Sequence, residues 1–415
     1  MNAAPNIGQP TLGVYVQVPF CASKCSFCNF SSSVERSATI DRYAGALRAE
    51  LANYRRFFAD CGIPPDILSH PVDSVYVGGG TPTLLGEERL TFLLRSLQQH
   101  FSWDHEDVEF TLETTPGSAD GALLRVLRGA EANRLSIGAQ TFVDRELGVV
   151  GRLHSADDTC ELVRQARNAS FQNISLDLIA GLPHQTKESF RYSLELTARL
   201  QPEHISLYLF EVDEKSRLGG EVVHGGNRYH ADAAPGDEFM ADAYEFGCEF
   251  LRREGYVQYE ISNFARPGFE SRHNRKYWQL APYVGLGAGA HSFDGVRRWS
   301  NEIDVRTYLA KIEAQQPAIS DCRTLTTEEQ VDEFFFVGLR QTQGINLEWA
   351  RARWGADCLK PWENKVQDLA HQGWLVLQSD RVSLARHTYL ISNEIFQEFL
   401  SLSPITLVDG KFGPG

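Results

Sequence analysis

Three cysteines near the start of the chain are the residues whose types and spacing point most directly to chemistry. Cys21, Cys25 and Cys28 form C-x3-C-x2-C in the stretch CASKCSFCNF, directly after the apolar run VYVQVPF. So short a loop can bring three thiolates to one centre, and thiolates favour iron–sulfur clusters or zinc. Zinc takes four ligands, but the next residues, NFSSSVERS, contain neither Cys nor His. A four-iron cluster on three cysteines would leave one iron open to a substrate; three unrelated thiols are the alternative.

Polar residues near the ends of later β-rich runs are a second set of candidates. Glu113 stands in TLETTPG, Gln140 in IGAQTF and Asp177 in SLDLIAGLP, and Arg152 follows in GRLHS. A carboxylate inside an apolar strand is costly unless it meets a partner, so each predicts either ligand contact or a buried polar network. The glycines of VGGGTPT allow positive φ and close approach of a ligand to the backbone. Together with the cysteine loop, these residues predict a cofactor site at one end of a sheet.

The elements that must position these residues follow a βα repeat. Six β-rich runs occur, in VYVQVPF, SVYVGGG, VEFTLE, RLSIGAQTF, NISLDLIAGL and HISLYLF. Apolar stripes over residues 40–58, 90–101 and 123–130 predict helices between them, and Ser155 followed by Asp158 is typical of a helix start. Near-continuous apolar strands alternating with helices predict a parallel sheet covered on its outer face. We therefore predict an α/β fold with a partial (β/α)6 barrel; a doubly wound sheet is the alternative.

Changes in composition divide the chain into four parts. We predict a flexible tail over residues 1–12, the barrel with its cysteine loop over 13–210, a barrel extension over 211–320 and a C-terminal domain over 321–405. Residues 211–236, rich in Gly, His and charge, predict a long loop of the kind that forms lids or binding segments. Helical patterns and a short hairpin predict that the C-terminal domain is small, helical and winged-helix-like. That shape can bind DNA, but the acidity favours a packing or lid role.

The overall composition excludes several classes of protein. The 415 residues carry a formal charge of −14, which argues against a broad basic surface and so against a nucleic-acid partner. No apolar run approaches the ~18 residues of a membrane span, and the first residues lack the pattern of an export signal. The five other cysteines are far apart and show no disulfide framework, so a cytoplasmic location is predicted.

The cysteine motif resembles that of the radical S-adenosylmethionine (SAM) enzymes, with the aromatic Phe27 before the last cysteine. More narrowly, YVQVPFC, GGGTPT, LETTP, SIGAQTF, LGRLH and LDLIAGLP are similar to the oxygen-independent coproporphyrinogen III oxidase family, over nearly the whole chain. The resemblance implies a radical SAM barrel with a [4Fe–4S] cluster on Cys21, Cys25 and Cys28. It also implies that S-adenosylmethionine chelates the open iron through its amino and carboxylate groups.

The same resemblance implies which residues surround S-adenosylmethionine. Glu113 and Asp177 suit ribose hydroxyls, and Arg152 suits a carboxylate through its planar fork. The residues that match family positions near the cofactor are Tyr15, Phe27, Gly79, Gly80, Thr81, Glu113, Gln140, Arg152 and Asp177.

Two further features distinguish branches within that family. Its decarboxylases carry another cysteine two residues after the third, where this chain has Phe30 in CNF, a pattern similar to the haem-chaperone branch. The stretch SRHNRKYWQ also matches the HNxxYW motif of that branch, with His273, Asn274, Tyr277 and Trp278. Imidazole is a common axial ligand of haem iron, and flat aromatic rings pack against a porphyrin. A histidine beside packing aromatics is the structural alternative.

We therefore predict a haem chaperone that binds haem, transfers it to haem-requiring proteins and carries a [4Fe–4S] cluster and an S-adenosylmethionine site. The complete cofactor motifs keep two enzymatic alternatives open: a coproporphyrinogen III dehydrogenase acting on a porphyrinogen, and a radical SAM methylase or cyclopropanase. No catalytic residue is assigned. Membrane-associated haem acceptors, a peripheral place at the inner membrane and a homodimer are also left open.

Overall fold

Parallel strands form the centre of the fold in this computed structural model, which describes residues 11–104 and 107–400. Within these residues a twelve-stranded sheet has the order β12-β11-β10-β9-β1-β2-β3-β4-β5-β6-β8-β7. The six strands that come first in the sequence lie side by side in the middle of this sheet and pair in parallel. They are β1 (Leu12–Val18), β2 (Val72–Gly79), β3 (Glu109–Thr114), β4 (Arg134–Gln140), β5 (Asn173–Ala180) and β6 (His204–Leu209). Because right-handed crossovers in this order all fall on one face, the arrangement confirms the partial (β/α)6 barrel and not the doubly wound sheet.

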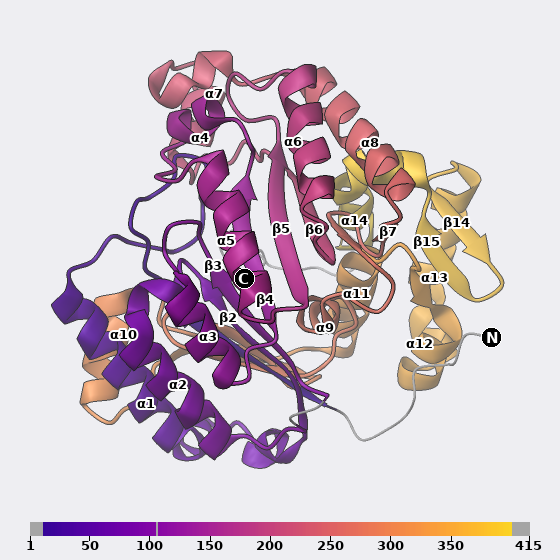
Figure 1. The fold of residues 1–415 in the computed structure, drawn as a ribbon. Helices are drawn as coiled ribbons and strands as arrows, with labels where there is room; N and C mark the ends of the chain where they lie inside the picture. The colour runs from indigo at the N-terminus through magenta and orange to yellow at the C-terminus, as the bar shows by residue number, and fades with distance from the viewer. Residues whose placement is uncertain (1–10, 105–106, 401–415) are drawn as a thin grey trace.

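Helices cover the outer face of these strands, as Figure 1 shows. They are α1 (Ser37–Asp60), α2 (Gly86–His100), α3 (Gly121–Gly129), α5 (Ala156–Asn168) and α6 (Lys187–Arg199), with the short α4 (Asp144–Val149) and the 3-10 turns η1 (Pro65–Ser69) and η2 (Pro82–Leu85) between them. The start of α5 is a capping box, in which the Asp158 amide donates to Ser155 Oγ at 3.2 Å and the Ser155 amide donates to the Asp158 carboxylate at 2.8 Å. The helices predicted from the apolar stripes and from Ser155 are confirmed.

Residues alternate along the barrel strands between an apolar outer face and a polar inner face. Successive side chains of a strand point to opposite faces, and outer-face residues such as Val14 and Leu112 are fully buried under the helices. The sequence predicted near-continuously apolar strands. In the structure the strands instead alternate apolar side chains with polar ones such as Glu113, Arg134 and Asp177. The inner face carries Tyr15, Gln17, Ser74, Tyr76, Thr111, Glu113, Arg134, Ser136, Ser175, Asp177, His204 and Ser206.

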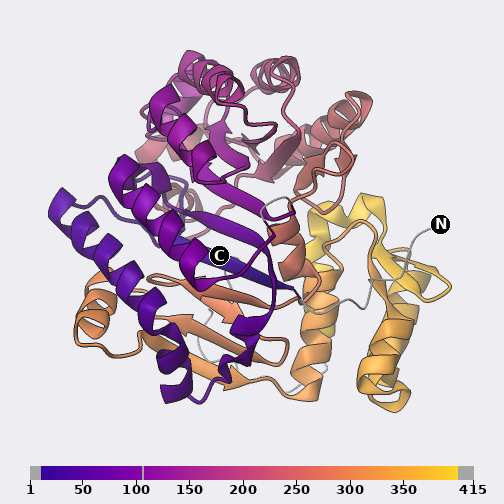
Figure 2. The same ribbon diagram turned by 60° about the horizontal axis from the view of Figure 1, so that its bottom comes forward.

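The segment predicted as a barrel extension adds strands to both edges of the sheet. Beyond β6 lie β8 (Asn263–Ala265) and β7 (Val257–Gln258), preceded by α8 (Asp237–Arg253). At the other edge β9 (Tyr283–Leu286) pairs in parallel with β1, and antiparallel strands continue the sheet, visible in orange beside the indigo strand in Figure 2. These are β10 (His291–Phe293), β11 (Arg297–Asn301) and β12 (Ile319–Thr324), with α10 (Val305–Glu313) packed on α1.

Residues 211–236 contain helical turns and are not the long loop that their composition predicted. They include α7 (Arg217–Val223) and η3 (Arg228–Ala233). Ser216 begins α7, since its Oγ accepts from the Gly219 amide at 2.9 Å. The five glycines of this stretch obscured the helical pattern in the sequence, because glycine is a poor helix former.

The C-terminal domain has its own apolar core and a small wing. Helices and turns α11 (Thr327–Gly338), α12 (Leu347–Trp354), α13 (Ala356–His371), η4 (Arg386–Ile391) and α14 (Ser392–Leu400) surround the strands β13 (Ile345–Asn346), β14 (Leu375–Gln378) and β15 (Arg381–Leu384). The three strands form a separate sheet in the order β13-β15-β14, the wing of the predicted winged-helix-like domain. Residues 1–10 of the predicted tail and 401–405 of the predicted domain lie outside the described residues. Within the described ranges no helix has the length and apolarity to cross a bilayer.

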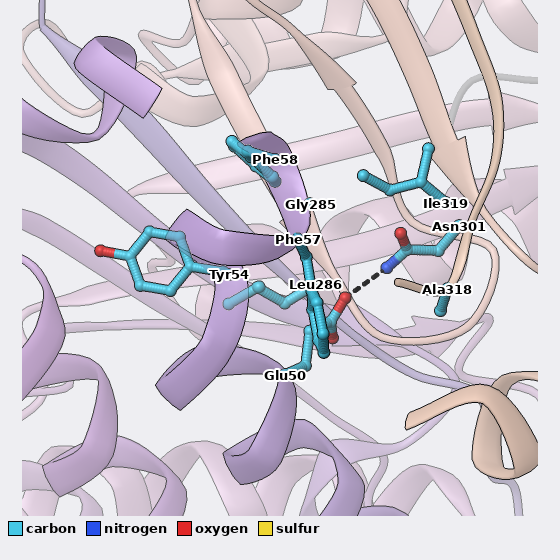
Figure 3. A pocket seen from close by; sticks show the side chains of 9 residues that line it. All are labelled: Glu50, Tyr54, Phe57, Phe58, Gly285, Leu286, Asn301, Ala318 and Ile319. Carbon is cyan, nitrogen blue, oxygen red and sulfur yellow. Dashed lines mark hydrogen bonds between the residues drawn. The ribbon is translucent and has the colours of Figure 1, made fainter. Parts of the chain in front are cut away.

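A buried carboxylate fastens α1 to the extension. Glu50 accepts hydrogen bonds from the Gly287 amide at 2.8 Å, Asn301 Nδ2 at 2.6 Å and the Tyr308 hydroxyl at 2.7 Å, and Figure 3 shows it facing Asn301 beside a small cavity. Gly287 needs its positive φ of 94° here, and an added Cβ would lie 2.5 Å from the Tyr43 hydroxyl. Burial raises the pKa of Glu50 to about 7.

This raised pKa predicts a pH dependence of stability. The folded chain holds a proton on Glu50 that the unfolded chain releases between pH 4.5 and about 7, so rising pH across that range should lower the free energy of unfolding, by about 3 kcal/mol in total. Glu50→Gln should remove that part of the slope in denaturant unfolding at pH 5, 6, 7 and 8. Glu161→Gln, at an exposed carboxylate of α5 whose pKa is lowered to about 2, should keep the wild-type slope. A full slope in Glu50→Gln would contradict the assignment.

Candidate functional site

The cysteine loop leaves the end of β1 and returns to it through backbone pairing. The Cys21 amide donates to the Ser33 carbonyl at 3.0 Å, and the Cys28 amide donates to the Cys25 carbonyl at 3.4 Å, which closes a turn between the second and third cysteine. All three thiols are free; Cys25 is buried and the other two are partly buried. Burial raises the pKa of Cys21, and the nearby Cys28 and Cys25 raise it further. In the part of the chain that the structure describes, no three His, Cys, Asp or Glu side chains are arranged as a site for one metal ion.

Arg152 reaches this loop from the connection after β4. Its Nη1 lies 3.7 Å from Cys25 Sγ, its Nη2 donates to the Gly138 carbonyl, and its buried Nε has no partner. A Cβ on Gly138 would lie 3.0 Å from Arg152 Nη2 and 2.9 Å from Gln140 Nε2, so the two polar side chains meet over this glycine.

Glu113 and the glycines after β2 form a second part of the site. The Gly79 amide donates to Glu113 Oε2 at 2.9 Å and the Tyr76 hydroxyl donates to Oε1 at 2.7 Å. Burial raises the pKa of Glu113 to about 7. Gly79 has a φ of 104°, and a Cβ there would overlap the amide of Gln17, which shows why this position tolerates no side chain. A Cβ on Gly80 would likewise overlap the Phe20 carbonyl.

The remaining residues predicted for S-adenosylmethionine lie around these two parts. The Thr81 amide donates to the Phe20 carbonyl at 2.7 Å and so ties the glycine turn to the strand end that precedes the cysteines. Asp177 lies on the inner face, 3.4 Å from Ser136 Oγ, and burial raises its pKa. Tyr15 lies deeper in the barrel, and Phe27 packs in a satellite core beside α7. The structure therefore gathers Arg152, Gln140 and Thr81 near the thiols, with Glu113 behind them.

The α7 segment, residues 211–236, packs directly on the cysteine loop. Asn29 Nδ2 donates to the Asp213 carboxylate at 2.9 Å, and the Leu218 amide donates to the Ser26 carbonyl at 2.8 Å. Arg217 donates to the Lys24 carbonyl. Because three successive parts of the loop are contacted, this segment covers one side of the thiols.

The HNxxYW motif lies at the opposite end of the barrel. It forms α9 (Arg272–Trp278), whose first turn is bound by Glu109 at the start of β3. The Glu109 carboxylate accepts from the Arg272 amide at 2.9 Å and the His273 amide at 3.1 Å. Figure 1 shows α7 and α9 at opposite ends of β5 and β6.

His273 is fully enclosed in the barrel lumen. Its Nδ1 lies 3.0 Å from Ser74 Oγ and its Nε2 lies 3.0 Å from the Tyr277 hydroxyl, so both ring nitrogens have partners. The ring packs against Tyr15 and Tyr76, with centroid distances of 6.1 and 5.4 Å. Burial, aided by the charges of Lys276 and Arg134, lowers the pKa of His273 to about 3 and keeps the ring neutral.

Of the other motif residues, Tyr277 lies beside His273 and Trp278 contacts the C-terminal domain. Asn274 is partly buried, and its backbone amide donates to Ser271 Oγ at 3.3 Å at the start of the helix. The Arg340 guanidinium stacks over the Trp278 ring at 4.7 Å. The residues predicted for haem therefore lie at the opposite end of the barrel from the cysteines and Arg152, and the two predicted sets meet only in the lumen, where the His273 ring packs against Tyr15.

Three inner-face residues went unnoticed in the sequence. Tyr76 joins the two ends of the barrel, since its hydroxyl binds Glu113 while its ring packs on His273. His204 lies between Ser175 Oγ at 2.7 Å and the Tyr259 hydroxyl at 2.8 Å, so both of its ring nitrogens have partners. Arg134 is the largest of the fully buried side chains. Its position as a charged residue at the start of the apolar run RLSIGAQ could have marked it in the sequence as a buried charge.

Comparison with known proteins now gives the family. Residues 15–197 match the Radical SAM superfamily and residues 325–390 match the HemN C-terminal domain. A Bacillus subtilis protein named "Heme chaperone HemW" is 35% identical over 386 residues, which cover 93% of this chain and 98% of that one. This chain belongs to the HemW family of radical SAM proteins. A Mycobacterium tuberculosis relative of the same name is 32% identical over 401 residues, covering 96% of both chains.

The similarity extends to a mammalian protein and to a solved structure. The mouse protein "Radical S-adenosyl methionine domain-containing protein 1, mitochondrial" is 31% identical over 388 residues, 90% of this chain and 84% of that one. The structure of coproporphyrinogen III oxidase (HemN) from Escherichia coli, a radical SAM enzyme, superimposes with a TM-score of 0.81 at 24% identity, covering 94% of this chain and 90% of that one. This match confirms the fold.

The glycine turn can be tested directly. Gly79→Ala should cost about 3 kcal/mol of stability, because alanine is strained at this positive φ and its Cβ overlaps Gln17. Gly45→Ala, in the middle of α1 with no atom near the added Cβ, should instead stabilise by about 0.5–1 kcal/mol. Chemical denaturation of both variants measures the difference, and equal midpoints would show that the turn relaxes freely.

Proposed function

We propose that this protein binds haem and delivers it to haem-requiring proteins, and that it carries a [4Fe–4S] cluster and S-adenosylmethionine. The observation that carries the proposal is similarity over almost the full length to relatives named heme chaperones. Phe30, at the position where the decarboxylases of the wider family have a further cysteine, supports the same choice.

The residues at the barrel mouth fit the two cofactors. Cys21, Cys25 and Cys28 would hold the cluster, whose fourth iron is left for S-adenosylmethionine. The unpartnered Nε of Arg152 is a donor for a carboxylate. When bound and reduced, the cluster supplies an electron to the sulfonium of S-adenosylmethionine.

Glu113 would hold the ribose hydroxyls in whichever protonation state the pH sets. With a pKa raised to about 7, Glu113 is a carboxylate above neutral pH and accepts hydrogen bonds from the hydroxyls. Below neutral pH it is protonated, and its O–H can donate one hydrogen bond. Tyr76 and the Gly79 amide fix its orientation in both cases. Asp177 would serve a second hydroxyl from the neighbouring inner-face position.

Haem would bind at α9 through His273. The neutral imidazole is the form that ligates iron, but His273 Nε2 first has to leave the Tyr277 hydroxyl. Arg340 and the α11–β13 turn hold α9 from the C-terminal domain, where Gln341 Nε2 donates to the Trp278 carbonyl at 3.2 Å. Movement of α9 away from the barrel therefore accompanies haem binding.

An enzymatic function is the second candidate. The candidate residues of the cofactor site, including Arg152 beside Cys25, are those a radical reaction would use. A porphyrinogen dehydrogenase and a methylase or cyclopropanase are the two forms of this alternative.

As a chaperone the protein would act in the cytoplasm, or at the inner membrane if its acceptors lie there, as a monomer or a homodimer.

The cluster can be tested by iron content. After anaerobic reconstitution the wild-type chain should hold about four irons, and Cys25→Ser should lose most of them together with the cluster absorption. Cys160→Ser, at a partly buried cysteine of α5, should retain both. Equal iron loss in the two variants would contradict the assignment of the loop.

Haem binding can be tested by absorption titration. His273→Ala should weaken haem binding about tenfold or more and change the spectrum, because it removes the axial imidazole. His204→Ala is the matched control, since His204 is also buried, neutral and paired with a tyrosine, yet lies outside the motif. Absence of a haem spectrum in the wild type would reject the chaperone proposal. Formation of a decarboxylated product from coproporphyrinogen III by reduced protein would favour the enzyme instead.

A further inference from the structure

Arg134 is a buried charge without a counter-ion in contact. It opens β4 on the inner face and is 1% exposed. Its Nη1 donates to Thr111 Oγ1 at 3.5 Å, the limit of a hydrogen bond, and its Nε has no partner. No ion pair joins it to a carboxylate within the described ranges 11–104 and 107–400, although a guanidinium has five N–H donors to satisfy.

The two carboxylates on which the charge of Arg134 acts, Glu113 and Asp177, are hydrogen-bonded to other groups. Burial raises the pKa of both Glu113 and Asp177, and the charge of Arg134 opposes part of that rise, so it acts on them through the lumen. Glu113, however, is bound to Tyr76 and Gly79, and Asp177 faces serine hydroxyls. Neither comes within ion-pair distance of the guanidinium.

The side chains that face Arg134 at its own level carry no negative charge. His273 and His204 both have a pKa lowered by burial and by this charge, so they add no negative partner. Register places Thr111 and Asn173 directly beside Arg134 on the neighbouring strands. An isolated buried cation costs several kcal/mol unless it is paired, so this layer of the lumen is suited to an anion.

We propose that Arg134 anchors an anion site in the barrel lumen, suited to one carboxylate group. A planar guanidinium with free Nε binds a carboxylate through paired hydrogen bonds. The site is distinct from the cofactor site, because Arg134 stands at the start of β4 whereas Arg152 and the cysteines lie beyond its end. The carboxylate comes either from a small free anion or from a haem propionate, and the second source rests on the proposed function.

Thermal unfolding of the full-length protein tests the site itself. At constant ionic strength, formate should raise the Tm of the wild type, and Arg134→Met should abolish that rise without lowering the Tm in its absence. Arg298→Met is the matched control: Arg298 is largely buried but already paired with Glu333 at 2.6 Å. It should lower the Tm, because Glu333 loses its partner, and keep the response to formate.

Haem and its dimethyl ester distinguish the two sources. If the carboxylate is a propionate, Arg134→Met should weaken haem binding about tenfold or more while leaving binding of the dimethyl ester within about twofold. If the carboxylate instead belongs to a small free anion, Arg134→Met should lose the formate response and keep its haem binding. Wild-type protein that binds no haem would reject the proposed function and still leave the formate test decisive.

Two outcomes would overturn the anion site. One is an Arg134→Met chain that retains both the formate response and the preference for haem over its ester. The other is a wild type that shows neither property. If Arg134→Met does not fold, Arg134→Lys keeps the charge but loses the fork, and it should give a formate response weaker than that of the wild type; an equal response would also overturn the site.

Discussion

The alternation of apolar and polar residues along six parallel strands is the constraint on which the rest of this structure depends. The outer face is buried under helices, so the inner face must satisfy its polar groups within a closed lumen. Glu113 does so with Tyr76 and Gly79, and His273 does so with Ser74 and Tyr277. Each pairing fixes a side chain that the family resemblance associates with a ligand. The lumen network therefore includes candidate residues of both predicted sites.

The barrel presents two chemically different ends that share this network. At the mouth, thiols and Arg152 come from loops that follow strands, and the α7 segment covers them. At the base, a helix from the extension closes the lumen and the C-terminal domain holds it in place. Tyr76 touches both ends, since its hydroxyl reaches Glu113 and its ring lies on His273. A change in the protonation or ligation of one end thus has a direct physical route to the other.

The sequence sufficed for features that depend on local chemistry or periodicity. Ser155 with Asp158 marked a helix start, the apolar stripes marked three outer helices, and the strand spacing marked the repeat. The α7 helix was missed because its glycines outweighed the signal of Ser216. The depth of His273 and the isolation of Arg134 could not be predicted, because they depend on which strand positions face inward and on segments more than one hundred residues apart. The predicted roles of the cysteines and of the motif residues remain predictions.

The pairing of β1 with β9 has a consequence for how the chain is made. Gly13 of β1 lies beside Tyr283 of β9, about 270 residues later. At ordinary synthesis rates of about 5–20 residues per second, the first strand waits on the order of tens of seconds for this neighbour. Meanwhile the hydrogen-bonding edge of β1 is uncovered, and an unpaired edge invites pairing with other chains. Contacts so distant in sequence also slow folding. A nascent chain is therefore most exposed to aggregation before its last third has emerged.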